Sequence, residues 1–282
     1  MALALGAGGA RGLAHIPALE ALDDLGIKPV AIAGASMGAV IGASYASGMS
    51  GSDIRNFALE TLRGRGGIAR RLVSHQLGRM RAHLREKRSF RGTPMRFDAA
   101  AVALDFLPPN LPETFEDLKI PLTVVATDFW RREGVLYRSG PLLPAVAGSM
   151  AIPGLLRPVE FEGRILVDGG VVNPLPFDLL RAGADIVIAI DLTRLANENS
   201  LAIPGAQESL IAAAYIMSNA IVSEKLKSAA PDILLRPNVN AFGALEFARA
   251  IPILKAAEPM KEELKRKLGE LLDAPGGKKR FQ

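Results

Sequence analysis

The chain has 282 residues, and its 34 lysines and arginines against 29 aspartates and glutamates give a net charge of +5. It holds no cysteine, which excludes a disulfide framework, a thiolate nucleophile, and zinc or iron–sulfur sites built from cysteine ligands. The three histidines are His15, His75 and His83, so the 199 residues after His83 contain none. Catalysis that depends on a histidine late in the chain is therefore excluded.

The composition, 49% hydrophobic and 22% charged, is typical of a globular protein with a full-sized core. The first residues lack the basic and apolar regions of a signal peptide, so we expect none. Without cysteine, a cytoplasmic location is the default expectation. We expect one domain over residues 1–273 and a disordered tail over residues 274–282.

The elements predicted along the chain alternate between strand and helix. Short apolar runs bounded by Gly, Pro or Asp predict strands at Leu3–Leu5, Val30–Ala33, Leu122–Ala126, Ile165–Val167, Ile186–Ile190 and Ile233–Leu235. Helices are predicted at Leu13–Leu25, Met37–Ala46, Ile54–Leu62, Phe177–Ala182, Glu208–Ser228 and Glu258–Leu272, with a loop over Leu107–Pro121. This alternation predicts an α/β fold with three α/β/α layers and a mostly parallel central sheet.

One segment, Pro29–Ser52, has 24 residues without a charge and is long enough to be mistaken for a membrane span. It is rich in Gly, Ala and Ser rather than Leu and Ile, and it breaks at Gly34. We therefore interpret it as a buried strand, a tight turn and a small-residue helix.

The positive charge is concentrated in Arg63–Arg91, which carries ten basic residues and one acid, a net charge of +9. Its aliphatic residues from Ile68 to Leu84 follow a near-helical spacing. A basic amphipathic helix suits a peripheral contact with an anionic membrane, at the inner membrane surface for a cytoplasmic protein, and such a segment could also act as a lid. The alternative is a solvated helix packed on the domain. Nucleic acid is not an expected partner, because only Phe90 interleaves the charges.

The first motif with chemical meaning is Gly34-Ala35-Ser36-Met37-Gly38, between a predicted strand and a predicted helix. A G-x-S-x-G pattern in this context is typical of a nucleophile held on a sharp turn. The glycines allow neighbouring elements to approach, and the helix N-terminus behind the serine supplies partial positive charge. The alternative is close helix–strand packing in a Gly- and Ala-rich stretch.

The second motif is the glycine-rich loop of residues 6–12, which opens a predicted helix and presents backbone N–H groups to an anion. A dinucleotide fingerprint starting at Gly6 would need glycine where the chain has Arg11, and the ending of a Walker-type loop is missing. The remaining interpretation is an oxyanion hole for attack by Ser36 on a carbonyl.

The third motif is Asp168-Gly169-Gly170, directly after a predicted strand. We expect its carboxylate at the same sheet edge as Ser36, because ligands of open α/β sheets bind where strands end. The alternative is an ordinary Asp-Gly turn.

The histidine positions then decide between mechanisms. A hydrolase triad in the order Ser, acid, His is not available, because no histidine follows Asp168. His15 is interpreted as a packed or surface residue of the first helix. A dyad of Ser36 and Asp168 remains, in which the carboxylate takes the serine proton. A carboxylate of ordinary pKa, about 3.9, is a weak base, so the site must desolvate it or hold it close to the hydroxyl.

Together the three motifs resemble the patatin-like phospholipase family, whose members carry G-G-G-x-[R/K]-G, G-x-S-x-G and D-G-[G/A] in this order. Residues 126–128, 149–154 and 171–174 also look like the bacterial branch of that family. The resemblance covers residues 3 to about 190, and more loosely extends to Leu235.

The resemblance implies a patatin-like fold with Ser36 as nucleophile and Asp168 as base. It implies an oxyanion hole formed by the backbone at Gly8, Gly9, Ala10 and Arg11, with motif glycines Gly34, Gly38, Gly169 and Gly170. Arg11 would also hold the loop or an anionic headgroup.

The expected activity is that of a serine lipid acyl hydrolase, of phospholipase A or esterase type, that acts on a phospholipid or another fatty acyl ester. No metal or cofactor is expected. Two positions depart from the family pattern: Ala7 replaces the first glycine of the triple, and Pro17 should kink or shorten the first helix. The alternatives are an acyl transferase or thioesterase of similar fold, although the related transacylases use a later histidine, and a catalytically vestigial lipid-binding scaffold.

Overall fold

The computed structural model describes residues 1–63, 97–194, 203 and 205–273. The basic segment Arg63–Arg91, apart from the backbone of Arg63, lies outside the described residues, and so does the predicted tail. The expectations about a lid, a membrane contact and disorder in these two segments therefore stay predictions.

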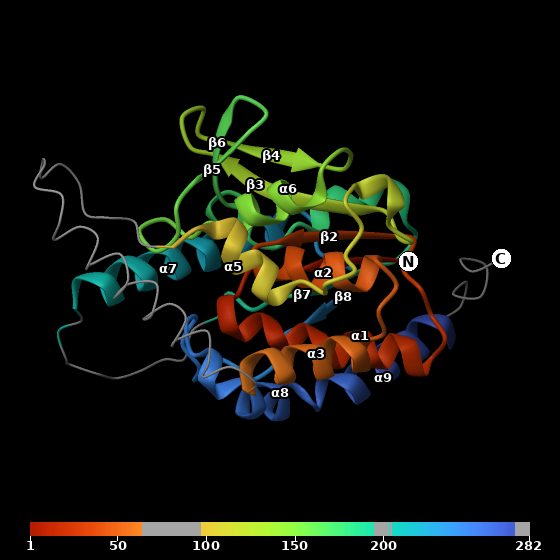
Figure 1. The fold of residues 1–282 in the computed structure, drawn as a ribbon. Coiled ribbons are helices and arrows are strands. Elements are labelled where there is room, and N and C mark those ends of the chain that lie inside the picture. Colours follow the sequence, from red (N-terminus) through yellow and green to blue (C-terminus); the bar gives the residue numbers. More distant parts are fainter. Residues whose placement is uncertain (64–96, 195–202, 204, 274–282) are drawn as a thin grey trace, which may run out of the picture.

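A mixed eight-stranded sheet forms the centre of the described structure (Figure 1). Its strands are β1 (Ala2–Leu5), β2 (Ala31–Ala35), β3 (Leu122–Asp128), β4 (Glu133–Tyr137), β5 (Val159–Phe161), β6 (Arg164–Asp168), β7 (Val187–Ile190) and β8 (Ile233–Leu235). The pairs β1–β2, β1–β7, β2–β3 and β7–β8 are parallel, whereas β3–β4, β3–β6 and β5–β6 are antiparallel.

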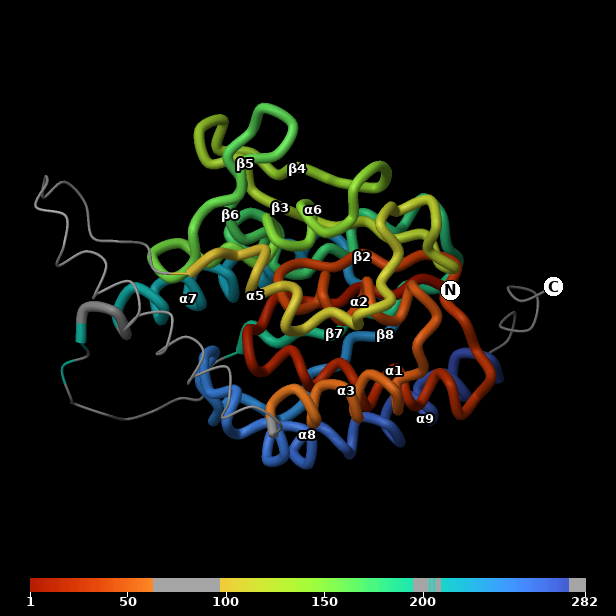
Figure 2. Tube along the Cα trace, in the orientation of Figure 1, coloured from red at the N-terminus to blue at the C-terminus, as the bar shows by residue number. Residues whose placement is uncertain are grey.

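Helices cover both faces of the sheet unequally. They are α1 (Ile16–Asp24), α2 (Met37–Ala46), α3 (Gly51–Arg63), α5 (Ala99–Phe106), α6 (Leu142–Ser149), α7 (Ala206–Ser228), α8 (Ala250–Ala257) and α9 (Met260–Asp273). Figure 2 shows α1, α3, α8 and α9 gathered on one side of the sheet. The larger apolar core lies on this side and includes Leu3, Ile32 and Ile188.

The opposite face of the sheet packs mainly on a 3₁₀ helix, η4 (Phe177–Gly183), and on the second half of α7. Phe177 and Val222 are buried there against Ala4 and Ala189 of the sheet. Successive residues of β1 and β7 therefore point into different cores, as the two-residue repeat of a strand requires. The predicted three-layer architecture with a mostly parallel sheet is confirmed.

All six predicted strands are present, within two residues at each end. The strands that the sequence did not predict are β4, which is mostly exposed, and β5, which has three residues and is half-buried, so neither shows the apolar run that marks a buried strand. The helices α5, α6 and α8 were also not predicted. The predicted helix Leu13–Leu25 is wrong at its start, because a 3₁₀ helix, η1 (Gly9–His15), precedes α1.

Two other predictions concern the first half of the chain. Pro17 lies in the first turn of α1 and does shorten the helix, because a proline lacking its N–H fits only at a helix start. The uncharged segment Pro29–Ser52 forms β2, the turn at Ser36, the buried helix α2 and the start of α3, as interpreted. Among the described residues, no helix is long and apolar enough to cross a membrane.

The strand registers explain how residues far apart in the chain meet at one point. On β3, Val125 pairs with Ala35 of β2 and also with β4, while Ala126 pairs with Asp168 of β6 and also with β4. A strand has only two edges, so β2 and β6 share the edge of β3 that β4 leaves free. They therefore lie end to end, running in opposite directions. The last residue of β6 faces the residue that follows β2, which is Ser36.

Candidate active site

Ser36 stands in a strained turn between β2 and α2. Its backbone has φ 55° and ψ −126°, a conformation that side chains other than glycine rarely adopt. The turn is tight enough that a Cβ on Gly38 would lie 2.2 Å from the carbonyl oxygen of Leu5, so glycine is required there. The sequence pattern correctly placed a strand–turn–helix elbow at this position, and Ser36 is only 4% exposed.

The side chains of Ser36 and Asp168 meet at the junction of β2 and β6. Ser36 Oγ donates a hydrogen bond to Asp168 Oδ2 over 2.6 Å, and the other carboxylate oxygen accepts the N–H of Gly170 over 2.7 Å. Burial raises the pKa of Asp168 to about 6, although both hydrogen bonds act in the opposite direction. The carboxylate is therefore a stronger base than an exposed one, as the sequence argument required.

The direction of β6 corrects the expected route by which Asp168 reaches Ser36. The sequence predicts the carboxylate at the end of a strand, on the same sheet edge as Ser36 in a mostly parallel sheet. The strand β6 is antiparallel to β3 and therefore to β2. Asp168 reaches the site because β6 approaches β2 head-on, and not because the two strands end at a common edge.

Ser149, at the end of α6, was missed as a site residue. Its buried Oγ accepts the N–H of Ser36 over 2.9 Å and donates to the carbonyl of Val125 over 2.6 Å. Two residues further on, the carbonyl of Ala151 accepts the N–H of Asp168. The segment that contains Ser149 thus holds both members of the pair. The sequence resemblance included residues 149–154 but gave no signal that assigned Ser149 this role.

The glycine-rich loop lies beside Ser36 and leads into η1. The N–H of Ala10 donates to the carbonyl of Ala244, and the N–H of Arg11 donates to the carbonyl of Gly8. No side chain in the described part of the chain caps η1, and the first N–H groups of a helix lack partners within it. The donors that the loop offers to a ligand are therefore those of Gly8 and Gly9. Gly9 has φ +55°, and a Cβ there would lie 2.3 Å from the Ala244 carbonyl.

Buried side chains fix this loop from behind. His15 Nε2 lies 2.8 Å from the carbonyl oxygen of Gly6, to which it donates, and burial lowers the pKa of His15 to about 4. His15 is thus a packed residue, one of the two alternatives in the sequence interpretation. Arg11, 1% exposed, donates to the carbonyl of Arg194, and its guanidinium carbon lies 4.1 Å from the ring centroid of Tyr215 on α7. Nothing in the sequence indicated the Tyr215 contact.

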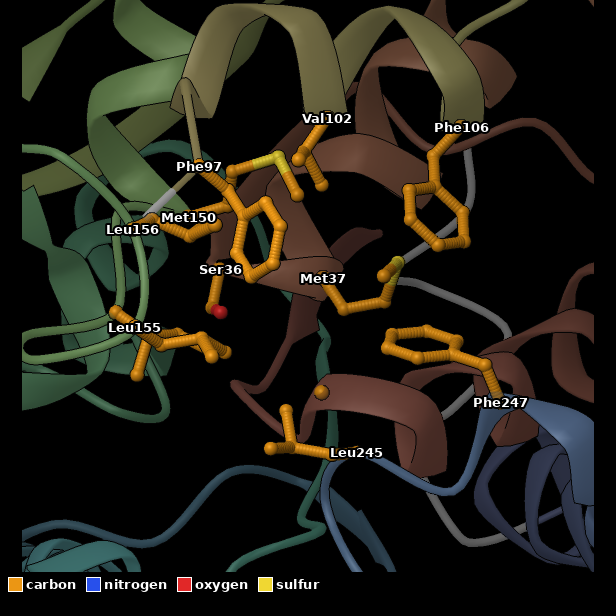
Figure 3. Close-up of a pocket in the computed structure, with 12 residues that line it drawn as sticks. Ser36, Met37, Phe97, Val102, Phe106, Met150, Leu155, Leu156, Leu245 and Phe247 are labelled. Carbon is orange, nitrogen blue, oxygen red and sulfur yellow. The ribbon is translucent and has the colours of Figure 1, made fainter. Parts of the chain in front are cut away.

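An apolar cavity of about 100 Å³ opens in front of Ser36 (Figure 3). Among the residues that the structure describes, every side chain that lines it is apolar apart from the Ser36 hydroxyl, which points into its centre. The lining comes from elements far apart in the chain and comprises Gly9, Met37, Phe97, Val102, Phe106, Met150, Ile152, Leu155, Leu156, Leu245 and Phe247. Such a cavity fits an alkyl chain with its reacting end at Ser36. Within the described part of the chain, no group of three His, Asp or Glu side chains gathers as metal ligands.

Comparison with known proteins places these features in a family. Residues 3–181 match the family model described as patatin-like phospholipase. An uncharacterized NTE family protein of Mycobacterium tuberculosis is 38% identical over 193 residues, which cover 68% of this chain and 49% of that protein. The human patatin-like phospholipase domain-containing protein 6 is 32% identical over 197 residues, which cover 68% of this chain and 13% of that protein.

The chain therefore aligns with about half of the length of its mycobacterial relatives and with a small part of the human one. Among solved structures, VipD from Legionella pneumophila aligns with 93% of this chain and 66% of its own, at 14% identity and a TM-score of 0.47.

Proposed function

Because the chain belongs to the patatin-like phospholipase family, we propose that it hydrolyses fatty acyl esters, with Ser36 as nucleophile and Asp168 as base. The observation that carries this proposal is the 2.6 Å hydrogen bond from Ser36 Oγ to Asp168 Oδ2 at the floor of an apolar cavity. A serine hydroxyl, a desolvated base and room for an alkyl chain are the parts that acyl-ester hydrolysis requires.

In the first step, Ser36 Oγ attacks the ester carbonyl carbon while its proton passes to Asp168. The N–H groups of Gly8 and Gly9 donate to the oxyanion that forms, and the buried charge of Arg11 behind the loop adds to the positive field. The tetrahedral intermediate collapses as Asp168 returns the proton to the departing alcohol. This leaves the acyl group on Ser36 and releases the first product.

In the second step, water attacks the acyl-enzyme and Asp168 takes its proton. Collapse of the second tetrahedral intermediate releases the fatty acid, and the proton returns to Ser36. Throughout both steps, Ser149 keeps the Ser36 backbone in its strained turn, because its Oγ accepts the Ser36 N–H. The same hydrogen bond leaves the Ser36 N–H unavailable to the oxyanion.

Replacement of the two side chains tests the proposal. Ser36→Ala and Asp168→Asn should each abolish hydrolysis of p-nitrophenyl acyl esters, and Ser36→Ala should abolish labelling by a fluorophosphonate. Ser44→Ala is the matched control: Ser44 is also buried on α2 but donates to the Val40 carbonyl in its own helix. Wild-type turnover by Ser36→Ala would refute the mechanism, and a parent protein that resists the fluorophosphonate would identify a vestigial site.

The pH profile is a second test. The base must be ionised, and the pKa of Asp168 is raised to about 6 by burial. The value of kcat/KM should therefore rise with pH through about 6 and then level off. A profile that is flat between pH 5 and pH 7 would exclude Asp168 as the base.

A further inference from the structure

The first two-thirds of α7 expose an apolar face. The sequence from Ser209 to Ser223 contains no charged residue. Leu210, Ile216 and Met217 are 56%, 61% and 60% exposed. With 3.6 residues per turn, Leu210 and Met217 lie on one line along the helix, with the exposed residues Ala213, Ala214 and Ala220 beside them. An exposed helical stripe of this composition marks an interaction surface.

The helix is held to the body by its opposite face and its last turns. Ser218 Oγ donates to the carbonyl of Gly170, next to Asp168, and Val222 is fully buried. Lys225 Nζ donates to Asn173 Oδ1 and pairs with Asp178. Because these contacts fix the orientation of α7, the apolar stripe faces outward in the structure as a defined surface.

A second exposed apolar group lies in the turn between β3 and β4. Phe129 is 49% exposed and Trp130 is 74% exposed, and Arg131 and Arg132 follow, both exposed. Asp128 Oδ1 accepts the backbone N–H groups of both Trp130 and Arg131, which fixes the turn. Tryptophan beside arginine is the combination found where proteins enter the boundary between water and lipid.

Both features lie at the end of the sheet that carries the proposed active site, where the parallel strands have their carboxyl ends. The strand β3 runs parallel to β2 and continues to Asp128, beyond the level of Ser36, so its turn projects past Ser36 at the same end. On the other side, a Cβ built on Gly154 would lie 3.2 Å from Leu210 Cδ2. Gly154 stands between Ile152 and Leu155, which line the Ser36 cavity. Figure 1 shows α7 projecting from the body, and α7 contacts the 3₁₀ helix η3 (Gly169–Val171) that directly follows β6.

We propose that this end of the sheet docks onto the surface of a phospholipid bilayer, with the α7 stripe and Trp130 entering the interfacial region. Arg131 and Arg132 would meet anionic headgroups. We choose a lipid bilayer as the occupant because the exposed stripe adjoins Gly154, which stands between two residues that line the Ser36 cavity, so a lipid chain could pass from bilayer to Ser36 without crossing water. The proposal rests on the proposed function for its choice of a lipid surface.

Tryptophan fluorescence tests the docking directly, because Trp130 is the only tryptophan in the chain. The full chain carrying Ser36→Ala is mixed with vesicles of phosphatidylcholine and phosphatidylglycerol, so that binding is measured without hydrolysis. We expect the emission to shift to shorter wavelength and to be quenched by lipids brominated in the acyl chain. Unchanged emission with vesicles would overturn the proposal. A blue shift that grows with protein concentration in the absence of vesicles would also overturn it, in favour of a second copy of the chain.

A second experiment locates the surface. Leu210→Glu combined with Met217→Glu should weaken vesicle binding about tenfold or more, because charge replaces two exposed apolar side chains that enter the bilayer on docking. Arg131→Gln and Arg132→Gln should each weaken binding to anionic vesicles about fivefold, an effect that salt removes. Val30→Glu is the matched control, 54% exposed at the opposite end of the sheet, and should bind as the parent does. Unaltered binding by the Leu210 and Met217 variant would overturn the role of α7.

A soluble ester separates this proposal from the proposed function. With Ser36 intact, the Leu210 and Met217 variant should lose hydrolysis of vesicle phospholipid and keep hydrolysis of p-nitrophenyl butyrate. Loss of both activities by a variant that still unfolds at the parent temperature would contradict a docking role. Hydrolysis of the soluble ester by Ser36→Ala would refute the proposed function and leave the vesicle-binding result standing.

Discussion

Two apolar surfaces lie at the same end of the sheet and differ in how they are supported. Around Ser36 an apolar lining surrounds the cavity, and hydrogen bonds with Ser149, Gly170 and Ala151 hold Ser36 and Asp168 in place. On α7 the stripe that includes Leu210 and Met217 is exposed. In the first region, burial raises the pKa of Asp168. In the second region, the apolar side chains of the stripe stay exposed to water in the isolated chain. The surface around Ser36 therefore suits chemistry, and the exposed surface suits contact.

The largest effect that should separate the regions is steric. In Gly169→Ala the new Cβ would lie 2.0 Å from the carbonyl oxygen of Val125, a central strand residue that also accepts Ser149. We expect this variant to lose about 4 kcal/mol of unfolding free energy or more, measured by urea denaturation, and its turnover with it. Gly269→Ala on α9 is the control: its Cβ meets nothing within 4 Å, and it should gain about 0.5–1 kcal/mol. An unchanged midpoint for Gly169→Ala would contradict the tight junction.

The next effect is electrostatic and depends on pH. Asparagine at 168 keeps the shape of the carboxylate and can still pair with Ser36 and Gly170, but it carries no charge. The pKa of Asp168 is about 6 in the folded state and near 3.9 when unfolded, so the folded parent holds the extra proton between these values and loses stability as pH rises through them. Asp168→Asn should therefore be more stable at pH 7 by up to about 3 kcal/mol.

This advantage should shrink as the pH falls through 6 and vanish below about 4, where Asp168 is protonated in both states. Urea denaturation of both proteins across this range measures it. A stability difference that does not change with pH would show that Asp168 is not buried as the structure describes.

A smaller effect concerns the support of the nucleophile. Ser149→Ala leaves the N–H of Ser36 and the carbonyl of Val125 without their partner, at a cost of about 1–3 kcal/mol. Turnover should fall about tenfold or more through kcat, because Ser149 touches the nucleophile and does not line the cavity. Ser44→Ala should cost less than about 1 kcal/mol and leave kcat unchanged. Equal effects of the two substitutions would show that Ser149 is only a packing residue.

The difference between the two regions also explains what the sequence could predict. The elbow at Ser36 and the loop at Gly8 and Gly9 are local, because adjacent residues determine each turn. The six predicted strands were marked by continuous apolar runs, whereas β4 is mostly exposed and β5 is half-buried, and neither carries such a signal. The pairing of Ser36 with Asp168 was predicted for the wrong reason, because strand direction depends on contacts between distant residues.

The contacts of Ser149 and Tyr215 could not be predicted from the sequence for a similar reason. Each depends on a side chain that meets a partner more than a hundred residues away, Ser36 in one case and Arg11 in the other. No periodicity in the sequence reports such a meeting. The exposed stripe of α7 was hidden as well, because the helix is apolar on both faces and its pattern does not say which face is covered.

The smallest effect gives the sharpest comparison, because it uses one residue type in both regions. Met150 lines the cavity at 6% exposure, and Met150→Ala should cost about 2 kcal/mol. Met217 is 60% exposed, and Met217→Ala should change stability by less than about 0.5 kcal/mol. On vesicles the order should reverse, with Met217→Ala weakening binding and Met150→Ala leaving it unchanged. If both substitutions destabilised the protein equally, α7 would be covered in solution, and its exposed face would not be available to a membrane.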